Sequence, residues 1–426
     1  MPPFFNPLAL FAIVITLATA FAIINHRYLH LPTTIGITAQ ALGVATVLLF
    51  LEQAVPMPRM DAARAVLDSI NLPATLLDGA LSFLLFAGAQ SVDQRELWQN
   101  RFSILALALL GTMLAVALFA AGMWMAFPLV GLAVSLPWCV VLGAILAPTD
   151  PVSVVGMLRR LGLPPRVQAI FAGESLFNDG VGVVVFAVAV QLAEAGTIGP
   201  LGDLVWQMVQ EVGGGLLLGF LCGCLAVWCI RLVTDAHLEL LISISLASGV
   251  YSLAKMLEVS GPVAAVTAGL ALGMPRALGA LSQHGQREIR NFWMMVDEVL
   301  NACLFVLIGF YVLSVPIRVP VLLAAVLAIP LSITVRALSV LLAMLPVYLR
   351  DSQRWRVLAI MTWGGLRGGI SIALALSLEH GPMRDVLLAV CYAVVVFTIL
   401  VQGLTMERVV RQVRLVRQKD KARCQP

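Results

Sequence analysis

The chain has 426 residues, of which 60% are hydrophobic and 12% are charged, and its formal net charge is +4. Soluble domains carry about 25% charged residues, so this composition excludes a soluble protein and indicates a polytopic membrane protein. The basic residues fall in short loops between apolar runs, which gives no basis for nucleic-acid binding. The seven cysteines show no metal-ligand spacing, so neither a zinc site nor a structural disulfide is supported.

The apolar runs predict an all-α protein with about thirteen transmembrane helices. The first run lacks a preceding basic stretch, so we interpret it as a retained helix and not as a cleaved signal peptide. Residues 59–71 are predicted to form an amphipathic surface helix. The predicted spans are residues 4–25, 31–51, 72–91, 101–122, 131–158, 165–194, 203–233, 237–257, 260–276, 286–314, 318–347, 354–379 and 384–407.

The distribution of basic residues predicts the orientation in the membrane. An odd number of spans places the two termini on opposite sides. If the C-terminus is cytoplasmic, most of the 27 Lys and Arg residues lie in inside loops and in the basic tail at residues 408–426, as the positive-inside rule requires. We therefore expect a multi-pass protein of the cell membrane with its N-terminus outside.

The first six and the last six spans enter the membrane from opposite sides, which predicts two inverted six-helix repeats, a common plan of secondary transporters. The fifth member of each repeat contains helix-breaking residues. Pro148 and Pro151 flank Thr149 and Asp150 in one, and four glycines surround Arg367 in the other. We expect two crossed broken helices, with Asp150 neutralising the positive end of a half-helix.

A polar stripe interrupts the apolar run from residue 167 to residue 192. Glu174 and Asn178 are four residues apart, as are Ser175 and Asp179, so a helix places all four over a limited arc. Their hard oxygen atoms suit alkali and alkaline-earth cations and protons. A buried polar network that only fixes helix packing is the alternative, but two acids in one membrane helix exceed what packing needs.

Two arginines also fall within predicted spans. Arg367 needs an acid or carbonyl partner at that depth, and Glu174 is the candidate acid; capping of free carbonyl groups in the broken helix is the alternative. Arg336 is expected to reach the cytoplasmic surface or to form a structural ion pair with Asp297 or Glu298.

These stretches resemble the signature sequences of monovalent cation:proton antiporters, specifically the NhaP/NHE type of sodium/proton exchanger. The similarity covers nearly the whole chain in order. It is carried by Thr149-Asp150-Pro151, Gly173-Glu174-Ser175-Leu176-Phe177-Asn178-Asp179-Gly180, Asp297-Glu298-Val299-Leu300-Asn301, Phe305-Val306-Leu307-Ile308-Gly309 and Gly365-Leu366-Arg367-Gly368-Gly369. The chain lacks the long cytoplasmic tail of the animal exchangers.

The resemblance implies a homodimer of a single transmembrane domain, with the short tail after residue 407. Its dimerisation region would be residues 1–100 and 237–314, its transport core residues 101–194 and 318–407, and its linking helix residues 203–233. The resemblance also implies that Asp179, Ser175 and Thr149 hold the cation, with Glu174 contributing directly or through water. Asn178 and Arg367 would then organise Glu174.

The sequence therefore predicts alternating access at a mid-membrane site, where a cation and a proton compete for Asp179. If Arg367 neutralises Glu174, one free acid remains and exchange is expected to be electroneutral. Na⁺ is the expected cation, with Li⁺ and K⁺ as other candidates, and Na⁺ and H⁺ are substrates, so no cofactor is expected. A cation-coupled organic-ion symporter and an ion channel remain as alternatives. An enzyme is not expected, because the chain has neither H-E-x-x-H nor G-x-S-x-G.

Overall fold

A computed structural model describes residues 7–54, 79–150, 152–195, 201–279, 281–315, 318–348 and 354–423. Within these ranges the chain is helical and contains no strand. The amphipathic helix expected at residues 59–71 lies outside the described residues. The all-α prediction is therefore confirmed for the described part of the chain.

The helices have the following bounds in chain order. They are α1 (Pro7–Ile24), α2 (Thr33–Ala54), α4 (Leu81–Ser91), α5 (Gln94–Gln99), α6 (Arg101–Leu105), α7 (Thr112–Leu129), α8 (Leu136–Ile145), α9 (Val152–Arg160), α10 (Pro165–Ala195), α11 (Leu201–Ile230), α12 (Ala236–Met256), α13 (Gly261–Leu272), α14 (Pro275–Leu278), α15 (Gln283–Phe310), α16 (Val319–Tyr348), α17 (Arg354–Trp363), α18 (Gly369–Ser377), α19 (Pro382–Phe397) and α20 (Gly403–Arg423). Wider π-helical turns at Asn25–Leu29, Ala106–Gly111 and Thr398–Gln402 continue α1, join α6 to α7 and join α19 to α20, and a 3₁₀ turn follows α15 at Tyr311–Ser314.

Each predicted span contains a helix among its described residues, although several helix ends differ from the prediction. Nine helical stretches in the described ranges are long and apolar enough to cross a membrane, and α4, α8 and α13 are shorter apolar helices. The helix predicted to end near residue 122 continues to Leu129. Residues 123–129 are also apolar, so hydropathy gives no sharp end at residue 122, and the helix end is set by the backbone hydrogen bonds.

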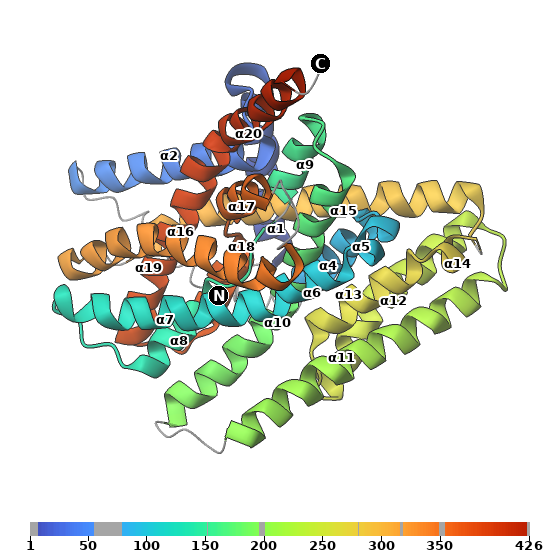
Figure 1. Ribbon diagram of the computed structural model, residues 1–426, viewed down its shortest axis with the longest axis horizontal. Helices are drawn as coiled ribbons and strands as arrows, with labels where there is room; N and C mark the ends of the chain where they lie inside the picture. Colours follow the sequence, from blue (N-terminus) through green and yellow to red (C-terminus); the bar gives the residue numbers. More distant parts are fainter. Residues whose placement is uncertain are drawn as a thin grey trace.

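Both of the expected helix interruptions are present. The first separates α8 from α9, between Ile145 and Val152, and the second separates α17 from α18, between Trp363 and Gly369. In Figure 1, α17 and α18 lie near the centre of the molecule, surrounded by longer helices. Each interrupted helix thus ends inside the bundle, where its unpaired backbone groups need partners from the protein.

The long helices pack in two groups around these interruptions. In one group α11 lies along α13, α13 packs on α4, and α15 packs on α2 and α4. In the other, α7 and α10 pack on α8, and α16 packs on α7 and α19. Figure 1 shows α11, α12 and α13 together on one side and α7, α8, α16 and α19 on the other.

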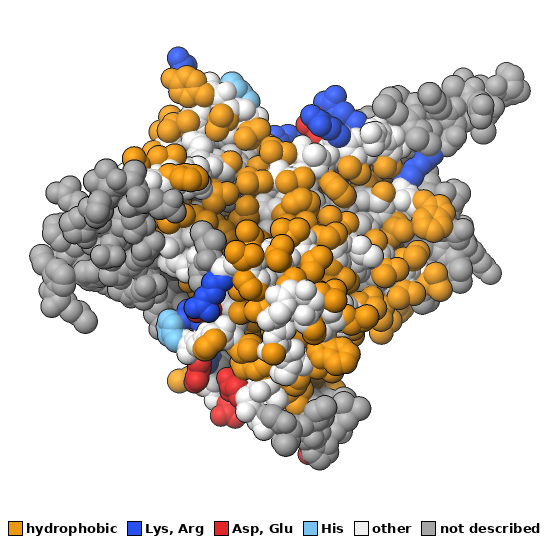
Figure 2. All heavy atoms as spheres, turned by 90° about the vertical axis from the view of Figure 1, so that its left-hand side faces the viewer, with side chains coloured by type: hydrophobic (Ala, Val, Ile, Leu, Met, Phe, Trp, Pro, Cys, Tyr) orange, Lys and Arg blue, Asp and Glu red, His pale blue; other side chains and the backbone are white. Residues whose placement is uncertain are grey.

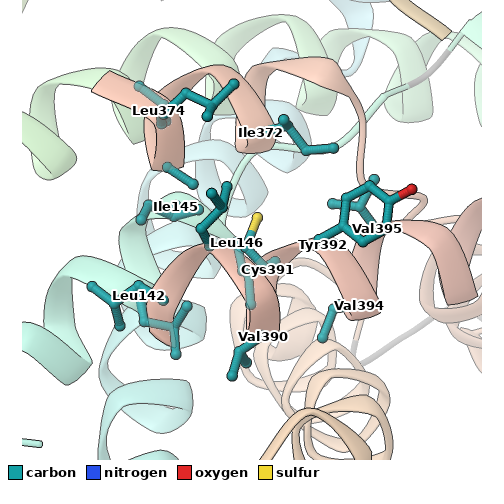
Figure 3. Close-up of a cluster of buried hydrophobic side chains, with 14 of the residues drawn as sticks. Leu142, Ile145, Leu146, Ile372, Leu374, Val390, Cys391, Tyr392, Val394 and Val395 are labelled. Atoms are coloured by element: carbon teal, nitrogen blue, oxygen red, sulfur yellow. The ribbon is translucent and has the colours of Figure 1, made fainter. Parts of the chain in front are cut away.

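A cluster of buried hydrophobic side chains holds the half-helices α8 and α18 against α19 (Figure 3). Branched and aromatic side chains from the three helices interlock, so the half-helices are fixed although each has only about ten residues. The labelled members are Leu142, Ile145, Leu146, Ile372, Leu374, Val390, Cys391, Tyr392, Val394 and Val395.

The outer surface of the bundle is strongly apolar. Figure 2 shows a broad hydrophobic region across one face, with charged side chains mostly in the upper and lower parts of the view. Large hydrophobic side chains are also exposed along α11 and α16, including Trp206, Leu217, Leu322 and Val326. Such a continuous apolar surface is expected where a protein contacts lipid chains.

The contact between α11 and α13 gives a test of this packing. A Cβ atom on Gly219 would overlap the carbonyl oxygen of Ala264, whereas one on Gly213, in the same helix, would have nothing within 4 Å. We expect Gly219→Ala to destabilise the protein by about 1–3 kcal/mol through overpacking. Gly213→Ala, the matched control, should cause no loss because alanine favours the helix. Thermal unfolding in detergent measures both, and equal midpoints would contradict the close packing.

Candidate functional site

The two unwound segments cross and satisfy each other's backbone groups. The amide of Asp150 donates to the carbonyl oxygen of Leu366 at 2.8 Å. Nη1 of Arg367 donates to the carbonyl oxygens of Ala147 at 2.6 Å and Pro148 at 3.1 Å. The proline-containing segment exposes carbonyl groups that no helix uses, and the arginine from the other interruption pairs with them. The crossing is therefore a hydrogen-bonded unit built from both halves of the chain.

The polar stripe of α10 faces this crossing and joins it. The hydroxyl groups of Thr149 and Ser175 are 2.8 Å apart. Nδ2 of Asn178 donates to Oγ1 of Thr149 at 2.9 Å and to Oε1 of Glu174 at 3.4 Å, and Oδ1 of Asn178 accepts from the Thr149 amide at 3.4 Å. All four side chains are buried. The four-residue spacing thus places these groups together, and Asn178 connects the two elements.

Glu174 forms a buried ion pair with Arg336 on α16. Nη1 and Nη2 of the arginine lie 2.6 and 2.7 Å from the two carboxylate oxygens, which is the bidentate arrangement. Nε of Arg336 also donates to the carbonyl oxygen of Met361 at 3.3 Å. Both side chains are almost inaccessible to solvent. Each charge therefore has its compensating partner within the protein.

This pairing corrects two predictions about the arginines. The expected partner of Glu174 was Arg367, but the bonds of the Arg367 guanidinium go to the carbonyl groups of the first interruption, which was the alternative. Arg336 was expected to reach the surface or to pair with Asp297 or Glu298, and it pairs with Glu174 instead. Free carbonyl oxygens can accept the hydrogen bonds of a buried arginine, so Arg367 does not require an acid. The sequence alone therefore could not decide which of the two arginines pairs with Glu174.

Asp179 differs from Glu174 in having no basic partner among the described residues. Its side chain is 6% exposed, and its Oδ1 atom is buried without a hydrogen-bond partner in the described part of the protein. A buried carboxylate oxygen in this condition is costly unless a cation or a proton occupies it. Asp179 is therefore the acid of the stripe that remains available to a ligand.

Asp179 and Thr149 line a cavity of about 290 Å³. The cavity extends between α4, α9 and α15 toward the end of α4 at Ser91 and the end of α9 at Arg159. Three other acids share it, namely Asp150, Asp297 and Glu298. An aqueous path lined with carboxylates raises the local concentration of cations.

Asp297 lies on the wall of this cavity. Its Oδ1 accepts from Nδ2 of Asn301 at 2.9 Å, within the same helix α15. Asp150 is half-buried at the crossing, beside the beginning of α9 and against Gly368. Its position agrees with a carboxylate opposite the positive end of a half-helix.

The ligands that this site offers fit a monovalent cation. One carboxylate, from Asp179, is accompanied by the neutral hydroxyl oxygens of Thr149 and Ser175. The described residues contain no group of three or more His, Cys, Asp or Glu arranged to hold a metal ion. Hard oxygen ligands of this kind suit an alkali cation better than a transition metal.

Comparisons with known proteins identify the family of the chain. Residues 13–412 match the family model described as "Sodium/hydrogen exchanger, transmembrane". The chain is 37% identical over 415 residues to the Na⁺/H⁺ antiporter NhaP of Pseudomonas aeruginosa, covering 95% of this chain and 97% of that protein. It is 31% identical to the Na⁺/H⁺ antiporter NhaH of Halobacillus dabanensis, covering 84% of this chain and 87% of that protein.

The fold matches that of a solved structure. The sodium/proton antiporter MjNhaP1 of Methanocaldococcus jannaschii, at pH 8, superposes with a TM-score of 0.74 at 18% identity, covering 95% of this chain and 98% of that one. The resemblance carried by the sequence motifs and the all-α membrane fold with its two broken helices are thereby confirmed. The chain belongs to the family of transmembrane sodium/hydrogen exchangers, in its NhaP/NHE-type branch.

Proposed function

We propose that this antiporter exchanges one Na⁺ ion for one proton by alternating access at Asp179. Membership of the exchanger family and the names of its relatives support Na⁺ and H⁺ as the transported ions. Asp179 is assigned as the acid that binds the ions because its buried Oδ1 atom has no hydrogen-bond partner among the described residues and its side chain lines the cavity. Thr149 and Ser175 supply neutral oxygen ligands, whereas both carboxylate oxygens of Glu174 are bonded to Arg336, so Glu174 is proposed to organise the site and not to bind the ion directly.

Competition follows from having one anionic ligand. A bound Na⁺ ion requires the ionised carboxylate, and protonation of Asp179 removes the main ligand of the ion. The site therefore holds either a cation or a proton. Carrying each in turn across the membrane produces exchange without any cofactor.

The one-to-one stoichiometry rests on the ion pair of Glu174. Arg336, and not Arg367 as the sequence suggested, neutralises this acid with two hydrogen bonds. Position 178 is an asparagine, so it adds no titrating group. Asp150 is assigned to the positive end of α9, which leaves Asp179 as the acid that exchanges ions. Glu174, Asn178, Arg336 and Arg367 are accordingly organising residues.

Transport measured at several clamped membrane potentials tests this stoichiometry. In proteoliposomes, a Na⁺ gradient should drive proton movement at a rate that does not change when a K⁺–valinomycin potential is imposed. The rate is independent of the potential because the exchange of one Na⁺ ion for one proton moves no net charge across the membrane. A rate that follows the potential, together with net charge movement, would overturn electroneutral exchange.

The same preparation separates the alternative transport classes. An organic-ion symporter would take up an organic solute with Na⁺ and without proton exchange. A channel would show linear, non-saturating flux and no counterflow. The family assignment and the lack of a recognisable hydrolytic motif both support a transporter that is not an enzyme.

Orientation and assembly complete the proposal. The excess of basic residues in alternate loops supports a cell-membrane protein with a cytoplasmic C-terminus. Arg159, which this orientation places on the cytoplasmic side, lines the cavity, so we propose that the cavity opens toward the cytoplasm and that this conformation faces inward. The protein is proposed to be a homodimer through residues 1–100 and 237–314, with residues 101–194 and 318–407 as transport core. Cross-linking of cysteines introduced at exposed positions of α1 and α2 tests the interface.

A further inference from the structure

A second, much smaller cavity lies beside Arg336 and Arg367. Its volume is about 10 Å³, which is close to the space that one water molecule needs. Side chains from three segments that are distant in the sequence line it. These residues are Ser332, Ile333, Arg336, Thr362, Gly365, Arg367, Thr398 and Gln402. The Glu174–Arg336 ion pair and the bonds from Arg367 to the carbonyl oxygens of the first interruption do not account for this cavity.

The π-helical turn between α19 and α20 brings polar groups to this cavity. A π turn widens the helix by one residue, and here it spans Thr398–Gln402. Oγ1 of Thr398 accepts a hydrogen bond from the Arg367 amide at 3.1 Å and donates to the carbonyl oxygen of Val395 at 2.9 Å. Gln402, at the other end of the turn, is 2% exposed. The turn therefore contacts the second interruption of the chain through its first residue.

Two acceptor atoms in the cavity wall have no partner within the described residues. They are Oε1 of Gln402 and Oγ1 of Thr362, both buried. Leaving a buried acceptor unpaired is unfavourable, because the atom has lost its bonds to water and gained none in the protein. Both lie next to guanidinium groups, which are rich in donors, yet neither makes a direct bond to them. A small polar molecule between acceptors and donors would satisfy both.

Arg336, which lines the cavity, has N–H groups that its bonds to Glu174 and Met361 leave unused. A guanidinium carries five N–H groups, and the bonds to Glu174 and Met361 use three of them. Gly365 leaves the necessary room, since a Cβ atom there would lie 2.7 Å from Nε of Arg336. The donors of the arginines and the free acceptors thus line one space of the size of a water molecule.

We propose that Gln402 is a positioning residue, which holds one buried water molecule between Arg336 and Arg367. The water accepts from the guanidinium groups and donates to Oε1 of Gln402 and Oγ1 of Thr362, which gives it the usual number of partners. It fixes the orientation of Arg336, which in turn neutralises Glu174 beside the site. This role rests on the proposed function of Asp179, because it acts on the charge next to that residue.

Two substitutions of Gln402 separate the predicted effects. Gln402→Met keeps the length of the side chain but removes its acceptor, so Arg336 is held less firmly. We expect the KM for Na⁺ to rise about tenfold with kcat changed less than twofold, as for other outer partners of ion ligands. Gln402→Glu places a carboxylate beside both arginines and competes for Arg336. Glu174 is then released as a second proton carrier, and exchange should begin to follow the membrane potential.

A matched control is Gln40→Met. Gln40 is a partly buried glutamine that donates to the backbone carbonyls of Phe21 and Gly36, remote from the arginines in its bonding. It should leave the KM for Na⁺ and the independence from potential unchanged. An unaltered KM in Gln402→Met, with potential-independent exchange in Gln402→Glu, would overturn the proposal. A different result would contradict the proposed function itself: Asp179→Asn still exchanging ions while the two Gln402 variants purify as folded proteins.

Density maps give a readout that does not depend on transport. At a resolution that shows ordered water, one peak should lie within hydrogen-bond distance of Oε1 of Gln402 in the wild type, and it should be lost in Gln402→Met. A protein prepared in bromide tests the charge of the occupant. An anomalous bromide peak between the arginines would contradict a water molecule, and so would direct bonding of Gln402 to either guanidinium.

Discussion

Asp179→Asn is expected to reduce Na⁺/H⁺ exchange to background while leaving the protein folded. Asparagine has nearly the same shape but cannot carry a proton or a negative charge, so neither substrate is held. The stability should not fall, because the substitution replaces a buried carboxylate, whose Oδ1 atom has no hydrogen-bond partner in the described part of the protein, by a neutral amide. Proton efflux from everted vesicles on addition of Na⁺, Li⁺ or K⁺ measures the exchange, and thermal unfolding in detergent measures the stability.

The control for this substitution is Asp203→Asn. Asp203 is an exposed aspartate in the first turn of α11, and the same chemical change there should alter neither exchange nor stability appreciably. Persistent exchange in Asp179→Asn would remove Asp179 from the site. A large fall of its unfolding temperature would show instead that the carboxylate has a structural partner.

Arg336→Gln is expected to destabilise the protein by about 3–5 kcal/mol. Removing one member of a buried ion pair leaves the other charge without compensation, and Glu174 is almost fully buried. Unfolding in detergent micelles measures the loss. The arginine also neutralises an acid beside the transport site, so any folded fraction should show exchange that depends on membrane potential.

A double-substitution cycle separates the ion pair from other effects of Arg336. Glu174→Gln removes the uncompensated charge, so Arg336→Gln combined with Glu174→Gln should recover much of the stability lost by the arginine variant alone. Replacing a buried pair by neutral groups is often close to neutral for stability. If the double variant is no more stable than Arg336→Gln, the pair does not contribute as the geometry indicates.

Local patterns in the sequence predicted the helices and one face of the site. The four-residue spacing on one helix fixes which side chains share its surface, and prolines and glycines mark where a helix must open. The grouping of the four polar side chains on α10 could therefore be predicted without the tertiary structure. These are Glu174, Ser175, Asn178 and Asp179. Thr149 joined them because its segment was expected to unwind near the middle of the membrane.

The choice between the two arginines could not be made in this way. Arg336 is 162 residues from Glu174 in the sequence, and the pairing depends on how α16 and α10 are placed by the other helices. A buried arginine can also donate its hydrogen bonds to carbonyl oxygens, so the hydrogen-bonding groups of Arg367 could find partners without an acid. The sequence left open whether Arg336 reaches the surface or pairs with an acid, because its actual partner depends on the packing of the helices.

The bonds from Arg367 to the first interruption have a consequence for biogenesis. Residues 147 and 367 are 220 positions apart, so the carbonyl oxygens of Ala147 and Pro148 enter the membrane long before the ribosome has made the arginine that caps them. During synthesis this segment must rely on water or on the insertion machinery for its hydrogen bonds. The crossing beside the proposed transport site is thus completed only when the last helices insert, and a chain truncated before residue 367 cannot assemble it.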